Sequence, residues 1–453
     1  MTLDTIHGWI SAADAIVWGP PLLIALFGTH IFLTIRTAFM QRYLFTAIKL
    51  SVTPEKGAAG DVSPFAALTT ALAATIGTGN IVGVATAVSL GGPGAVLWMW
   101  LTGVLGMATK YSEALLAVKY RVKTADGTML GGPMYALENG LRMKWLAVLF
   151  SFFTVFASFG IGNMVQANSI STLAASTFGV SVHVSGVVMA VLTAVVILGG
   201  LRSIARVCEW LVPFMAIVYV GGCLIILGTN SHLLIPAVQL IVTSAFSPTA
   251  AAGGFAGVAV ITAARYGVAR GLFSNESGLG SAPIVAAAAQ SRNPVRQALV
   301  SATGTFWDTV VICLLSGLVI VTSILDQPSL GALRGSELTA GAFREAMPTF
   351  GPIVLTLGLL TFVFSTILGW SYYGERAAEY LWGKVAILPY RIAWVVAVYV
   401  GSVVSLNLVW DFSDLANGLM ALPNLIALVL LSNVVAAETR RYLTSGNLDD
   451  AGD

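Results

Sequence analysis

The chain has 453 residues, of which 57% are apolar and only 10% are charged, whereas about a quarter of the residues of a soluble protein are charged. No charged residue lies between Asp61 and Lys110 or between Glu209 and Arg265. Each of these stretches exceeds the ~20 apolar residues that cross a bilayer. The composition therefore excludes a water-soluble globule and indicates a helical protein that crosses the lipid bilayer several times.

The net charge is only +2, and the basic residues lie in short segments between apolar runs, so nucleic acid is not an expected partner. Cys208, Cys223 and Cys313 are scattered through apolar segments, and the four histidines show no ligand spacing with them. We therefore expect neither a disulfide framework nor a bound cofactor. The first residues, Met1 to Asp14, contain no Lys or Arg, so we expect no cleavable signal peptide and a retained first span.

Eleven apolar spans are predicted. In chain order they lie near 14–35, 64–88, 94–117, 147–170, 184–200, 209–228, 252–287, 297–325, 351–374, 390–409 and 414–436. One set of alternate loops, counted with Lys110, holds 19 Lys and Arg residues and the other holds 2, while Arg265 and Arg270 fall inside the seventh span. Because cytoplasmic loops are enriched in basic residues, we expect a plasma-membrane protein with its N-terminus outside and its C-terminus in the cytoplasm.

An internal repeat follows from the number of spans. Without the first span, ten remain, and two groups of five enter the membrane from opposite sides, which is the condition for inverted repeats. The predicted fold class is thus an all-α polytopic membrane protein with a 5+5 inverted repeat and one extra N-terminal helix. The predicted divisions are residues 1–62 for the extra helix and a cytoplasmic loop, 63–230 and 231–436 for the two repeats, and 437–453 for a cytoplasmic tail.

The first span of each predicted repeat contains helix-breaking residues. These are residues 77–80 (GTGN) and residues 271–280 (GLFSNESGLG). Paired interruptions in two halves are typical of a transporter binding site. The amides of an unwound helix can bind a carboxylate and its carbonyls a cation, so an amino-acid zwitterion and a sodium ion would satisfy both. The alternative is that Gly79 and Gly83 form a close-packed contact between helices.

Polar side chains on other spans could complete such a site. Phe362, Thr366 and Trp370 share a helical face, and Ser365 flanks it. Two adjacent hydroxyls opposite an unwound segment suit a hard cation that binds several oxygens. The alternative is that both hydroxyls bond to the preceding helical turn. Gln166 shares a face with Gly162 and could contact a substrate, although amides in membranes also bond helix to helix.

Two acidic residues lie at membrane depth, Glu276 within the second break and Asp308 in the next span. Ionisable groups at this depth indicate function. Either residue could bind sodium, carry a proton or pair with Arg270, and the sequence leaves these cases open.

Three segments resemble those of the alanine or glycine:cation symporter family. They are residues 91–103 (GGPGAVLWMWLTG), 131–135 (GGPMY) and 271–283 (GLFSNESGLGSAP), and the likeness extends from about residue 15 to 436. The resemblance implies a LeuT-type fold and sodium-driven uptake of small neutral amino acids, either alanine or glycine, across the lipid bilayer.

The resemblance also implies roles for individual residues. The amides after residues 77–80 would hold the substrate carboxylate, Asn80 would belong to one sodium site, and Ser365 with Thr366 to another. The predicted substrate-binding residues are Thr75, Gly77, Thr78, Gly79, Asn80, Gln166, Phe273, Ser274, Ser277, Gly278, Thr366 and Trp370. The predicted sodium ligands are Ala74, Thr75, Asn80, Ser365 and Thr366.

Three alternatives remain at this stage. The first is a proton-coupled amino-acid transporter that uses Glu276 or Asp308. The second is an intramembrane enzyme, which we do not expect because the chain has no His-x-x-x-His or Gly-x-Ser-x-Gly motif and no aspartate pair in apposed spans. The third is a channel. Alanine against glycine, stereochemical preference, sodium stoichiometry and oligomeric state are left open by the sequence.

Overall fold

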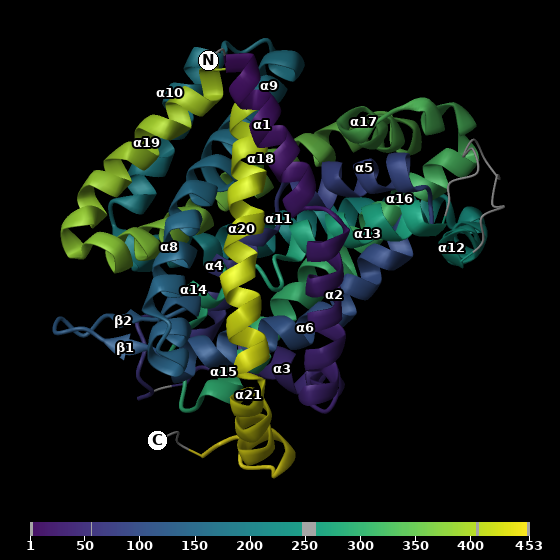
Figure 1. The fold of residues 1–453 in the computed structure, drawn as a ribbon. Helices are drawn as coiled ribbons and strands as arrows, with labels where there is room; N and C mark the ends of the chain where they lie inside the picture. Colours follow the sequence, from purple (N-terminus) through teal and green to yellow (C-terminus); the bar gives the residue numbers. More distant parts are fainter. Residues whose placement is uncertain (1–2, 56, 247–259, 405–406, 451–453) are drawn as a thin grey trace.

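The computed structural model describes residues 3–55, 57–246, 260–404 and 407–450, and these form a bundle made almost entirely of helices (Figure 1). The α-helices of the first half are α1 (Leu3–Val17), α2 (Pro20–Arg36), α3 (Leu44–Ser51), α4 (Pro64–Thr75), α5 (Val84–Gly91), α6 (Ala95–Lys119), α7 (Pro133–Tyr135), α8 (Lys144–Phe159), α9 (Val165–Phe178), α10 (Val182–Ile197) and α11 (Gly200–Thr229). Those of the second half are α12 (Ser231–Phe246), α13 (Val260–Asn275), α14 (Pro283–Ala286), α15 (Pro294–Thr305), α16 (Leu314–Asp326), α17 (Gly335–Ala346), α18 (Gly351–Trp382), α19 (Ile387–Val403), α20 (Asn407–Leu430) and α21 (Ser432–Glu438). Strands β1 (Val122–Lys123) and β2 (Met129–Leu130) pair antiparallel. The predicted all-α polytopic class is confirmed.

Capping residues in the sequence explain where the central helices begin. Ser63 accepts a hydrogen bond from the amide of Ala66, and Pro64 occupies the first turn of α4. Asn293 and Pro294 start α15 in the same way. The polar cap accepts a hydrogen bond from one free amide of the first helical turn. The proline fixes a helical φ at a position where no amide donor is needed.

Each predicted span matches a helix or a pair of helices, apart from the segments of the seventh and tenth spans that lie outside the described residues (252–259 and 405–406). Among the described residues, seven helices are long and apolar enough to cross a membrane, and the bent pair α4 and α5 makes up to eight. The count of eleven spans therefore stays a prediction. Helices α12 and α17 were not expected.

Lys110 does not lie in a loop, as the sequence count placed it. It stands inside α6 and is buried, with only 3% of its surface exposed. The prediction was wrong because a single Lys near the end of an apolar run cannot be distinguished from a flanking residue without the tertiary contacts. The basic bias of the remaining loops persists without it.

Helices from the two predicted repeats pack on each other. α6 packs against α13 and α15, and α4 packs against α18. In Figure 1, α20 runs through the front of the bundle beside α1 and α2, and the start of α1 lies at the opposite end from α21. The β1–β2 hairpin and α3 lie at the α21 end, and α17 lies at the other. The breaks in the helices thus meet in the interior, between these two ends.

Candidate functional site

The first break ends α4 at Thr75 and turns the chain before α5 begins. Ile76 is extended, and a π-helical turn, η2 (Gly79–Gly83), leads into α5 at an angle of 56° to α4. The amide of Gly77 donates to the Oδ1 atom of Asn80 at 2.9 Å. Asn80 therefore stabilises the unwound segment from within, because it replaces one helical hydrogen bond lost at the break.

The second break follows α13. Glu276 has a φ of +54°, and Gly278 and Gly280 have φ values of +93° and +88°, which glycine adopts without strain. The amides of Gly278 and Gly280 donate to the Oε1 atom of Glu113 on α6, at 3.0 and 3.1 Å. A carboxylate buried in α6 thus holds the loop between α13 and α14.

The hydroxyls of Ser365 and Thr366 on α18 meet the carbonyls of the first break. Ser365 Oγ lies 3.2 Å from the carbonyl oxygen of Ala73, and Thr366 Oγ1 lies 3.4 Å from that of Ile76. Both hydroxyls also bond to the carbonyl of Phe362 in their own helix. The expected back-bonding and the expected contact with the break are therefore both present. Two hydroxyls of α18 thus face two carbonyls at the end of α4 and in the break, and oxygens of these kinds are ligands of hard cations.

Asp308 joins the two breaks. It lies in a π-helical segment, η5 (Phe306–Cys313), and is fully buried. Its Oδ1 atom accepts from Asn80 Nδ2 at 2.7 Å, and its Oδ2 atom accepts from Ser274 at 2.9 Å and from Thr309 at 2.6 Å. Donors from η2, α13 and η5 thus surround one carboxyl group, which ties the two breaks together.

A small cavity of about 20 Å³ lies between the breaks. Its walls come from both breaks and from α9, α18 and α20. The residues that line it are Ala74, Thr75, Gly77, Thr78, Gly79, Ile161, Gln166, Phe273, Glu276, Thr366, Trp370 and Asn417. Most of the predicted substrate-binding residues therefore share one cavity.

Two buried amide oxygens in the cavity wall have no partner within the described residues. They are Gln166 Oε1 and Asn417 Oδ1. Gln166 is oriented by its other end, since Nε2 donates to the carbonyl of Ile161 at 2.9 Å. An unsatisfied buried acceptor is costly, and the ammonium group of a bound solute is a donor that can satisfy such an oxygen.

Four predicted substrate-binding residues do not border this cavity. Asn80 and Ser274 bond to Asp308 instead. Ser277 pairs with Thr305, and Gly278 bonds to Glu113, so the loop directs both residues toward α15 and α6. The sequence spacing could not show this, because the positive φ values after Glu276 turn the chain away from the cavity.

Of the alternatives that the sequence left open for Glu276, the pairing with Arg270 does not occur among the described residues. Glu276 accepts hydrogen bonds from Ser281 and from Trp370 Nε1, the latter at 3.1 Å. Arg270 lies one helical turn before Phe273 and stands over its ring, 5.9 Å from the centroid. Glu276 therefore lines the small cavity, whereas Arg270 does not.

Sequence reasoning missed four contributors to this region. The carbonyls that meet the hydroxyl pair belong to Ala73 and Ile76, the neighbours of the predicted Ala74 and Thr75. Glu113 and Asn417 were missed as well. An acidic residue inside the apolar run 94–117 was a usable signal for Glu113, whereas backbone carbonyls leave no signal in side-chain identity.

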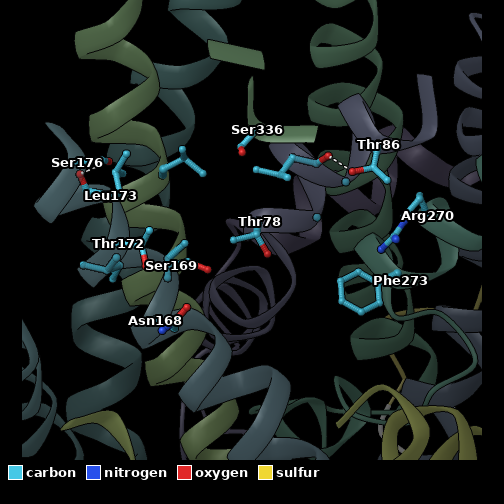
Figure 2. Close-up of a pocket in the computed structure, with 16 residues that line it drawn as sticks. Thr78, Thr86, Asn168, Ser169, Thr172, Leu173, Ser176, Arg270, Phe273 and Ser336 are labelled. Atoms are coloured by element: carbon cyan, nitrogen blue, oxygen red, sulfur yellow. Dashed lines mark hydrogen bonds between the residues drawn. The ribbon is translucent and has the colours of Figure 1, made fainter. Parts of the chain in front are cut away.

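A larger cavity of about 480 Å³, which we call the vestibule, adjoins the small one on the α17 side. Thr78, Gly79 and Phe273 line both cavities. Figure 2 shows Arg270 and Phe273 on one wall and α9 residues such as Asn168 and Thr172 on the facing wall. The path toward the small cavity from this side passes Phe273.

The opposite path is closed at the α21 end. The chain before α4 pairs with the chain after α14, since the amide of Asp61 donates to the carbonyl of Ala288 and that of Gln290 to the carbonyl of Val62. Arg121 donates to the carbonyl of Ala289 at 2.9 Å, and further bonds reach the carbonyls of residues 59 and 287. Burial lowers the pKa of Arg121, and the charge of Asp61 opposes that shift. One side chain thus braces both segments.

The family model of the sodium:alanine symporter family matches residues 3–450. The chain belongs to this family. It is 52% identical over 441 residues to the sodium/alanine symporter AgcS of Methanococcus maripaludis, with 96% of each chain covered. It is 37% identical over 425 residues to the amino-acid carrier protein AlsT of Bacillus subtilis, with 93% of this chain and 89% of that one covered. The chain is therefore a membrane-embedded, cation-coupled amino-acid symporter and not an enzyme.

Proposed function

We propose that this symporter couples an inward sodium gradient to the uptake of small neutral amino acids, alanine or glycine. The observation that carries the proposal is the position of Thr366. Its side chain contacts the carbonyl of Ile76 and also lines the cavity of about 20 Å³. A sodium ion bound there would fix the first break beside the substrate, which links occupancy of the two sites.

The cavity walls favour a small zwitterion. Gln166 Oε1 and Asn417 Oδ1 are acceptors for its ammonium group, and the unwound residues 77–79 are placed to receive its carboxylate. Trp370 is a buried, bulky wall of the cavity. A cavity of about 20 Å³ has room for about one water molecule as it stands, so its walls must move apart to admit a substrate, which favours a small one.

Asp308 and Glu276 are both buried beside the breaks, and either could couple uptake to a cation. The family model names sodium, and not a proton, as the coupled cation of this family. Proton coupling through Asp308 or Glu276 is the alternative that the experiment below distinguishes.

Counterflow in proteoliposomes tests the proposal. Vesicles loaded with unlabelled alanine should accumulate labelled alanine or glycine in sodium and not in choline, and leucine should exchange poorly. Uptake that persists without sodium and follows a pH gradient would support the proton-coupled alternative and contradict the proposal.

We place the protein in the plasma membrane with the α17 end outside and the α21 end in the cytoplasm. The basic loops support this orientation, because Lys49, Arg121, Lys123 and Arg440 all lie toward the α21 end, in or near α3, β1 and α21. The three native cysteines are buried, so a cysteine placed at Ser445 can be labelled selectively. An impermeant thiol reagent should label it in inside-out vesicles and not in intact cells; the reverse pattern would contradict the orientation.

A further inference from the structure

The second break is held from three helices, one of which lies outside both predicted repeats. Glu113 on α6 accepts hydrogen bonds from the amides of Gly278 and Gly280. The Nδ2 atom of Asn424 on α20 donates to the carbonyl of Gly278 at 2.9 Å. Helix α2, which belongs to the extra N-terminal segment, packs against α6, α13 and α20. The extra segment therefore reaches the region of the second break.

Two side chains of α2 cover the chain at Gly278. Leu26 and His30 lie one helical turn apart, and both are fully buried. A Cβ atom built on Gly278 would lie 2.6 Å from the Leu26 Cδ2 atom and 3.9 Å from the His30 Cε1 atom. The loop after α13 is thus in direct contact with a helix that neither the cation site nor the cavity uses.

The ring of His30 has one nitrogen with a partner and one without. Its Nδ1 atom shares a hydrogen bond of 2.7 Å with the Oγ1 atom of Thr109. Its Nε2 atom is buried and has no partner in the part of the chain that the structure describes. A buried polar atom without a partner costs free energy, so we expect this nitrogen to find one in another state of the transport cycle.

The hydroxyl of Ser277 lies near this nitrogen. A Cβ atom built on Gly106 of α6 would lie 3.4 Å from His30 Nε2 and 3.2 Å from Ser277 Oγ, so both atoms approach α6 at the same place. The Ser277 hydroxyl bonds instead to the Oγ1 atom of Thr305, at 3.1 Å. A rotation or a small shift of Ser277 can therefore exchange Thr305 for His30 as its partner.

Binding of a substrate supplies such a shift. Glu276 lines the cavity of about 20 Å³, whereas Ser277, the next residue, lies on the side away from it. Because the walls of this cavity must move apart to admit an amino acid, we expect the wall that carries Glu276 to move toward α6 and α2. The same movement brings Ser277 toward His30.

We infer that His30 is a positioning residue for the second break, and that it bonds to the Ser277 hydroxyl when the break shifts to admit the amino acid. The exchange stabilises the widened cavity, so His30 raises the affinity for the amino acid without touching it. The extra helix α2 thereby takes part in substrate binding. The inference rests on the proposed function only in that the amino acid binds beside Glu276.

Equilibrium binding of radiolabelled alanine to the purified full chain, in sodium, tests the role of His30. His30→Leu keeps a buried side chain of similar size without the nitrogen, so alanine affinity should fall about 2-fold to 10-fold, the effect of one hydrogen bond. His30→Gln places an amide near the position of Nε2 and should restore most of the affinity, whereas His30→Asn keeps only the bond to Thr109 and should not. The matched control is Thr29→Val on the same helix, which should leave the affinity unchanged, because the Thr29 hydroxyl bonds to the carbonyl of Ala25 in its own helix. Equal affinity in the parent and His30→Leu, or rescue by Asn and not by Gln, would overturn the inference.

A double-mutant cycle tests the exchange of partners itself. His30→Leu should have no effect on alanine affinity in a Ser277→Ala background, because no hydroxyl is left to change partners. Thr305→Val should tighten alanine binding, since it removes the bond that Ser277 must break. An equal effect of His30→Leu in both backgrounds, or weaker binding in Thr305→Val, would contradict the exchange.

The unfolding temperature without alanine identifies a merely structural role. Such a role would lower this temperature in His30→Leu and leave the alanine affinity of the folded protein unchanged, which would overturn the inference. Binding is measured in parallel for glycine and glutamine, with sodium and with choline. A parent that binds glutamine alone, or that binds without sodium, would count against the proposed function, and the same comparison of variants, made with the amino acid that binds, would still decide the role of His30.

Discussion

Thr366→Val is the substitution that addresses the cation site most directly. It keeps the shape of the side chain and removes the hydroxyl that lies 3.4 Å from the carbonyl of Ile76. A hydrogen-bond-type contact with a charged group contributes about 1.5–3 kcal/mol. Since about 1.4 kcal/mol corresponds to a factor of ten in affinity, sodium affinity should fall about 10-fold to 100-fold.

The assay is the sodium dependence of alanine uptake in proteoliposomes, normalised to the amount of folded protein. Thr361→Val is the matched control, since the Thr361 hydroxyl bonds only to the carbonyls of Leu357 and Gly358 in its own helix. The control should keep the parental sodium dependence. If Thr366→Val keeps it as well, the hydroxyl pair does not bind the coupled cation and the reasoning is refuted.

Three further substitutions test the neighbouring parts of the site. Gly77→Ala places a Cβ atom 2.9 Å from Thr366 Oγ1, whereas the Cβ atom of Gly79→Ala lies 3.5 Å from its nearest neighbour. Uptake should therefore fall about tenfold or more in Gly77→Ala and much less in Gly79→Ala. Equal losses of uptake in the two variants would contradict this packing. Trp370→Ala should weaken alanine binding and admit valine, since a pocket distinguishes each methylene by about 1–3 kcal/mol; competition binding with a series of amino acids measures it, and an equal loss for all sizes would place the side-chain pocket elsewhere. Arg121→Gln removes the brace at the α21 end, so a cysteine introduced at the buried Ala289, whose carbonyl accepts a hydrogen bond from Arg121, should react faster with a thiol reagent than in the parent. An unchanged rate would show that Arg121 does not hold this path closed.

The sequence predicts those parts of the site in which the types of the side chains show where a helix breaks. Residues 77–80 and 271–280 interrupt apolar spans, and the structure breaks both helices there. Ser365 and Thr366 were predicted because they lie by the helical face of Trp370 and correspond to a hydroxyl pair of the fold that the sequence resembles. Their partners were not, since Ala73 and Ile76 contribute backbone carbonyls that any residue could supply.

The parts that sequence does not predict depend on contacts between distant segments. Glu113 reaches the amide of Gly278, 165 residues later, and Asn417 enters the cavity from α20. Helix α17 was missed because its polar residues, such as Glu337 and Arg344, are typical of a loop outside the membrane. It is helical because its buried face, including Leu338 and Phe343, packs against the bundle.

The most direct test of the central claim is the driving force for uptake. Proteoliposomes containing the purified chain are given, in separate experiments, an inward sodium gradient, an inward proton gradient without sodium, or neither. Sodium bound beside Thr366 predicts transient accumulation of labelled alanine above its external concentration with the sodium gradient alone. Accumulation driven by the proton gradient in the absence of sodium would contradict the account.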